Sequence, residues 1–117
     1  MSYLTYKQLN LLDEFSFIAG TPYTLTYTVY DEDGATPLDL NSSTTKLYAS
    51  PYGQPNYVAI EVAGVISATP GVFTVTLEAV HTSALSGLFV QQPAIIDFTG
   101  EEFRLGQGNF IIEPRIG

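Results

Sequence analysis

The side chain best suited to acid–base chemistry is His81, the single histidine of the sequence. A serine-hydrolase site needs such a base beside a nucleophile, with a carboxylate that orients it. Ser83 and Glu78 lie close to His81 along the chain, but no nucleophile-elbow motif surrounds them. The absence of cysteine excludes thiolate chemistry and cysteine-ligated zinc. We therefore predict that the protein is not an enzyme and holds no catalytic residue, metal or other cofactor.

An acidic run at residues 31–34 has some of the oxygen ligands that a calcium loop needs. The EF-hand pattern also requires a bidentate glutamate at its twelfth position, where this chain has Ser42. Asx side chains cap turns without any metal, and this interpretation accounts for the run. A looser calcium site using Asp31, Asp33 and Asp39 is the alternative.

A second acidic group, Asp97, Glu101 and Glu102, flanks a predicted hairpin. Two carboxylates that face each other across a cleft can hydrolyse a glycoside, but a domain of this size has little room for such a cleft. Adjacent acids at a turn are instead expected to be solvated. The glycines at 106–108 precede a strand rather than a helix, which excludes a dinucleotide or P-loop site.

Tyrosines provide the broadest binding signal. Tyr48, Tyr52 and Tyr57 surround a turn rich in Pro and Gly. Such side chains can cover the end of a β-sandwich, anchor a protein interface or stack on sugars, and the sequence leaves these three roles open. Our candidates for an interface are Tyr52 and Tyr57, together with the N-terminal residues Tyr3, Leu4 and Tyr6.

The charge of the chain argues against polyanionic partners. Its formal net charge is −8 over 117 residues, and its four basic residues are scattered along the chain. Neutralising phosphates or anionic lipid headgroups requires clustered cations, so we expect no binding to nucleic acid or membranes. No apolar run is long enough to span a bilayer, and residues 1–10 do not read as a secretory leader.

The elements that must position these residues are strands. Residues 23–30 and 72–79 alternate strictly between apolar and mostly threonine positions, which is typical of strands with one buried face. Turn signals recur every 8–12 residues. We therefore predict an all-β fold, an immunoglobulin-like antiparallel β-sandwich of seven to eight strands.

Several local expectations follow from this pattern. Residues 57–63 and 65–68 form a strand pair or one bulged strand around Gly64, and Pro93 places the strand 88–98 at a sheet edge or at a bulge. At most one short helical turn lies near 81–87, capped by Thr82 or Ser83 and ended by Gly87. Residues 14–117 form a single domain, and residues 1–13 are a terminal strand, a short helix or an arm that docks on a neighbour.

The order of features resembles the immunoglobulin-like domains of tailed-bacteriophage virions, such as the N-terminal domain of phage baseplate upper proteins. The segments that carry the resemblance are residues 18–22, 30–34, 38–40, 69–74, 85–89 and 108–112. They are turn and strand patterns that together cover most of the chain.

This resemblance implies a non-enzymatic structural component of a virion, made in the host cytoplasm. Its partners would be other capsid, tail, neck or baseplate proteins, and homo-oligomers are expected. Since no receptor-binding region follows residue 117, capsid decoration or a tail adaptor fits as well as a baseplate role. A carbohydrate-binding module of the β-sandwich type is the alternative.

Overall fold

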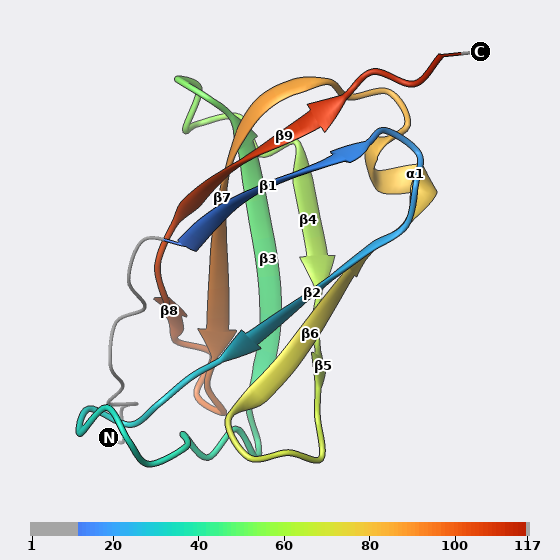
Figure 1. Ribbon diagram of the computed structural model, residues 1–117. Helices are drawn as coiled ribbons and strands as arrows, with labels where there is room; N and C mark the ends of the chain where they lie inside the picture. The colour runs from blue at the N-terminus through green and yellow to red at the C-terminus, as the bar shows by residue number, and fades with distance from the viewer. Residues whose placement is uncertain (1–11, 117) are drawn as a thin grey trace.

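The computed structural model describes residues 12–116, which fold into two packed β-sheets and one short helix (Figure 1). The elements in chain order are β1 (Leu12–Ile18), β2 (Tyr23–Thr28), β3 (Thr44–Pro51), β4 (Ile60–Ala63), β5 (Val65–Ile66), β6 (Val72–Leu77), α1 (Ala79–Thr82), β7 (Gly87–Ile96), β8 (Glu102–Arg104) and β9 (Gly108–Glu113).

The larger sheet has the strand order β1-β9-β7-β3-β4, with β8 also paired to β7, and the smaller sheet has the order β2-β6-β5. The two sheets form an immunoglobulin-like β-sandwich, which confirms the predicted fold class. Two details differ from the prediction. The described residues contain nine strands, two of them very short, and β1 pairs with β9 in parallel rather than antiparallel.

The period-two segments behave as expected. β2 and β6 pair in continuous antiparallel register from Tyr23↔Leu77 to Thr28↔Val72. Phe73, Val75 and Leu77 are fully buried between the sheets, while the threonines of both strands point outward. Burying the apolar side chains of one face supplies the main driving force for the sandwich.

Stacked aromatic rings join the N-terminal strand to both sheets. The Phe15 ring lies 4.9 Å from the ring of Phe110 in β9 and 4.9 Å from that of Tyr23 in β2, measured between centroids. Phe17 stacks on Tyr23 as well, at 5.1 Å. These contacts bury apolar area and hold β1 in its parallel pairing.

The expectation of an edge strand or a bulge at Pro93 was wrong, since the register of β7 with β3 runs through Pro93 without a shift. β7 is a central strand, and Pro93 pairs with Leu47 of β3. The carbonyl of Pro93 accepts the N–H of Leu105. Because the N–H and C=O of one residue in an antiparallel strand point to the same side, an N–H at position 93 would also point toward Leu105. There, β7 changes partner from β9 to β8, and residues 105–107 bend between them. The proline is tolerated because no ladder hydrogen bond is required at that gap.

Gly64 is where the chain crosses from one sheet to the other. β4 belongs to the larger sheet and β5 to the smaller, so residues 57–68 form neither the predicted strand pair nor a single bulged strand. A Cβ on Gly64 would lie 2.3 Å from Thr45 Oγ1 and 3.1 Å from the Thr74 carbonyl oxygen. The crossing therefore needs a residue without a side chain.

The helical turn lies slightly earlier than predicted. α1 begins after Glu78 and ends at Thr82, so Thr82 is its last residue rather than its N-cap. Thr82 is buried, and its hydroxyl accepts the N–H of Gly20 at 3.0 Å. Gly87 begins β7, with a φ of 108°, instead of ending the helix.

We predict that Gly64→Ala lowers the free energy of unfolding by about 1–3 kcal/mol, because the new methyl group overpacks the crossing. Urea denaturation followed by circular dichroism measures this change. Thr45→Ala in the same chain removes the nearest clashing atom and should restore part of the loss. An unchanged unfolding midpoint for Gly64→Ala would show that the crossing has room for a side chain.

Candidate binding groove

A groove lies on the outer face of the larger sheet. Its floor consists of outward-facing residues of the two central strands, Tyr48 and Ser50 from β3 and Val90 and Gln92 from β7. These residues face outward because Leu47, Ala49 and Gln91, their neighbours along the strands, point into the core. The groove has a volume of about 380 Å³.

The loop between β3 and β4 forms one wall. It contributes Tyr52, Gly53, Pro55 and Val58 to the lining, next to Pro51 at the end of β3. The loop is tied to the sheet, since the N–H of Tyr52 donates to Leu88 O and that of Ala59 donates to Ala49 O, both at 2.9 Å. The wall is therefore held in place by backbone hydrogen bonds before any ligand arrives.

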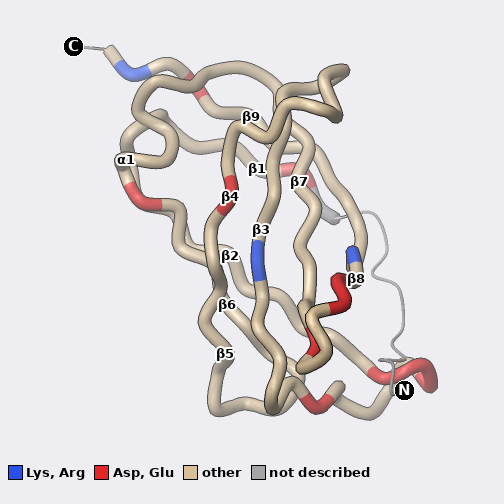
Figure 2. Tube along the Cα trace, turned by 180° about the vertical axis from the view of Figure 1, so that it is seen from behind, with Lys and Arg blue, Asp and Glu red and all other residues tan. Residues whose placement is uncertain are grey.

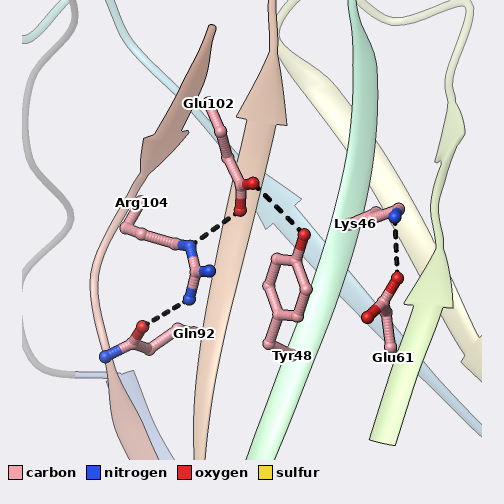
Figure 3. Close-up of polar contacts among 6 residues, drawn as sticks. All are labelled: Lys46, Tyr48, Glu61, Gln92, Glu102 and Arg104. Atoms are coloured by element: carbon pink, nitrogen blue, oxygen red, sulfur yellow. Dashed lines mark hydrogen bonds and ion pairs between the residues drawn. The ribbon is translucent and has the colours of Figure 1, made fainter. Parts of the chain in front are cut away.

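Polar side chains on β3, β7 and β8 form a row across the sheet (Figure 3). Arg104 donates from Nε to Glu102 Oε1 and from Nη1 to Gln92 Oε1, each at 2.8 Å. Its guanidinium carbon lies 4.0 Å from the centre of the Tyr48 ring. The Gln92 amide donates in turn to Gln107 Oε1 at 3.3 Å. Planar groups that hold one another in this way are fixed in orientation.

Charges along this row are compensated. Lys46 Nζ lies 2.8 Å from Glu61 Oε2, and this hydrogen bond raises the pKa of the lysine. Arg104 is paired with Glu102. Burial, followed by its hydrogen bond to Glu102, raises the pKa of the Tyr48 phenol, which remains a proton donor. The charges beside the groove are thus paired with one another.

The structure brings only part of the predicted interface together. Tyr52 is 62% exposed and lines the groove, whereas Tyr57 is 57% exposed but lies outside the lining. Tyr3, Leu4 and Tyr6 lie outside the described residues. Gln92, Arg104 and Gln107 could not be selected from the sequence, because these residues converge only through the pairing of β7 with its neighbours.

The acidic run at 31–34 forms a capped turn. Asp33 Oδ1 accepts the N–H groups of Ala35 and Thr36, and Oδ2 accepts the Thr36 hydroxyl, as the Asx interpretation predicts. These hydrogen bonds, that of the hydroxyl first, lower the pKa of Asp33 to about 2. Asp39 caps a separate turn at Asn41. Within residues 12–116, no three His, Asp or Glu side chains converge as a metal site would require.

His81 serves the short helix. The imidazole Nδ1 of His81 accepts the backbone N–H of Glu78 at 2.9 Å, and the backbone N–H of His81 donates to the Glu78 carbonyl at 3.0 Å. This arrangement uses the imidazole to close the first turn.

In the part of the chain that the structure describes, no helix is long and apolar enough to cross a membrane.

Asp97 organises the β7–β8 hairpin. Its Oδ1 accepts the Thr99 hydroxyl at 2.5 Å, the Thr99 N–H at 2.9 Å and the Glu101 N–H at 3.0 Å. The hydrogen bond from the Thr99 hydroxyl is the main cause that lowers the pKa of the Asp97 carboxyl. The carboxylate is therefore a turn cap, and Glu101 and Glu102 lie exposed beside it.

The fold is an immunoglobulin-like β-sandwich with a groove on the outer face of its larger sheet. No protein-family model matches the chain, and no curated protein sequence matches it. The structure is similar to that of CopC from Methylosinus trichosporium, with a TM-score of 0.50 and 14% identity over 89% of this chain and 87% of that one.

A second similar structure is the superoxide reductase (neelaredoxin) from Ignicoccus hospitalis. The TM-score is 0.44 and the identity 14%, over 96% of this chain and 81% of that one. At such low identity the likeness to CopC shows a shared sandwich fold and nothing about ligands.

We predict that Asp97→Asn weakens the loss of stability on acidification. A carboxyl with a lowered folded-state pKa stabilises the fold above its unfolded pKa, near 3.9, and loses this contribution as the pH falls through the folded pKa. Urea denaturation at several pH values between about 5 and 2.5 measures the slope of the free energy of unfolding against pH. The exposed Glu32→Gln is the control and should keep the wild-type slope. Identical slopes for Asp97→Asn and wild type would contradict the role of the Asp97 carboxylate as a turn cap.

Proposed function

We propose that the chain is a non-enzymatic structural component of a tailed-phage virion, which assembles through its smaller sheet. The virion context is supported by the order of turn and strand motifs in the sequence. The assembly surface is supported by the chemistry of β2, β5 and β6, whose three strands contain no charged residue. This absence is notable in a chain with a net charge of −8.

The charge-free surface covers the outer face of the smaller sheet. Threonines of β2 and β6 stand opposite each other there, as in Thr24↔Thr76 and Thr26↔Thr74, and Val65 beside them is 69% exposed. In Figure 2 the tubes of β2 and β6 carry no coloured residue, whereas β3, β4 and β8 do. Centres of protein interfaces are depleted in charged residues in the same way.

Among the described residues, β2 has an open edge, since it pairs with a strand, β6, on one side only. The N–H of Val29 donates to Gly71 O, and this register directs the backbone groups of Tyr23, Leu25 and Tyr27 toward β6. The N–H and C=O groups of the threonines between them therefore point away from the sheet. Among residues 12–116, no strand pairs with this edge. The edge has no lysine, internal proline or bulge, the features that usually block pairing with another strand.

The occupant we propose for this edge is β2 of a second copy, paired antiparallel about a two-fold axis. Two copies with a net charge of −8 repel each other over much of their surface. β2 paired with β2 brings no charges together and extends the sheet by continuous hydrogen bonding. Many such contacts in a symmetric particle would compensate for a modest affinity at each one.

We predict that the purified chain forms a dimer that Thr26→Pro dissociates. The proline removes an edge-facing N–H from each copy, and two lost hydrogen bonds weaken the dimer by at least about tenfold. Light scattering after size-exclusion chromatography over a concentration series measures the dissociation constant. Thr26→Lys should act in the same direction by placing like charges across the axis.

The matched control is Thr44→Lys, which adds the same charge at an exposed threonine of β3, in the larger sheet and away from the proposed assembly surface, and should leave the dissociation constant unchanged. Circular dichroism of each variant confirms that it is folded. A wild-type chain that stays monomeric, or a dimer that survives both changes at Thr26, would overturn assembly through this edge. Mass spectrometry of purified particles from the encoding phage tests the virion role, which fails if the chain is absent from them.

A further inference from the structure

The groove on the larger sheet has the size and chemistry of a ligand site. Its volume of about 380 Å³ falls within the range of pockets that hold small molecules. The lining combines apolar side chains, among them Tyr52, Val58 and Val90, with the polar groups of Gln92, Arg104 and Gln107. A few convergent polar groups in an otherwise apolar pocket are typical of a site that orients its ligand.

We propose that this groove binds a single neutral hexose unit of a glycan. A hexose has an apolar face of C–H groups and an edge of hydroxyl groups. The exposed Tyr52 ring on the loop wall matches the apolar face, and the amide and guanidinium groups across the floor match the hydroxyl edge. The contact between Gln92 and Gln107 uses only the oxygen of the Gln107 amide, so its nitrogen can donate to a hydroxyl.

The rigidity of the site supports a weakly bound, flexible ligand such as a sugar. Arg104 is fixed by Glu102, Gln92 and the Tyr48 ring, as Figure 3 shows. The wall is fixed by backbone hydrogen bonds of Tyr52 and Ala59. Because these groups are already ordered, binding does not require them to lose further conformational freedom.

Electrostatics restricts the class of sugar. The cations beside the groove are each paired with a carboxylate, Lys46 with Glu61 and Arg104 with Glu102. The whole chain has a net charge of −8. An acidic sugar would therefore meet a repulsive field and no uncompensated cation, whereas a neutral one avoids this repulsion.

The site is independent of the proposed assembly surface. The groove lies on the outer face of the larger sheet and the open edge belongs to the smaller one, so both can be occupied together. Loss of sugar binding and loss of dimerisation are separate observations, and one proposal can fail while the other stands.

The test is a ¹⁵N-NMR titration of the full chain with the methyl glycosides of glucose, galactose, mannose and N-acetylglucosamine, up to their solubility limits. Glucuronate and N-acetylneuraminate are the acidic counterparts. For at least one neutral glycoside we expect shift changes confined to amides around the groove. Tyr52→Ala and Gln92→Ala should each weaken binding by roughly tenfold, as expected for a lost stacking or hydrogen-bonding contact.

Tyr57→Ala is the matched control, since this tyrosine is similarly exposed but lies outside the lining, and its affinity should stay at the wild-type value. No shift changes with any neutral glycoside would overturn the proposal. Binding that is unaffected by Tyr52→Ala would place the sugar elsewhere, and preference for an acidic sugar would overturn the neutral class. Each variant is checked for folding by its unperturbed amide spectrum.

Discussion

A buried hydrogen bond between the two sheets sets the arrangement of the molecule. The Tyr27 hydroxyl of β2 donates to the Gln91 side-chain oxygen of β7, and both residues are almost fully buried. Burial raises the pKa of the tyrosine, which keeps its proton available for this bond. Separating the partners would leave polar atoms unsatisfied in the core, at about 1–3 kcal/mol each. The bond therefore fixes how the smaller sheet sits over β7.

Strand β7 has residues that face the core and residues that face the groove. Since side chains alternate along a strand, Gln91 points inward and Gln92 outward. Two adjacent glutamines thus have unlike roles, one joining the sheets and the other holding Arg104 in the polar row. Pro93 follows them at the gap between β8 and β9, where the neighbouring chain bends and Gln107 comes within reach of Gln92.

The division of the sandwich into two sheets also separates its charges. Gly64 lets the chain leave the larger sheet after β4 and enter the smaller one at β5, so the hydrophobic Val65 falls beside the threonines of β6. The paired charges Lys46–Glu61 and Arg104–Glu102 remain on the other side of the molecule. The strands of the smaller sheet therefore carry no charge, whereas the outer face of the larger sheet carries paired charges.

Sequence alone determined the features that depend on near neighbours. The strands at 23–30 and 72–79 follow from period-two alternation, the turn at Asp33 from Asx capping, and the exposure of Tyr52 and Tyr57 from the surrounding Pro and Gly residues. Only the tertiary structure decided the parallel β1–β9 pairing, the sheet crossing at Gly64 and the central position of Pro93. It alone brought together Tyr48, Gln92 and Arg104. Partner choice between strands depends on contacts across tens of residues, such as Tyr48 with Glu102, and these leave no local periodicity in the sequence.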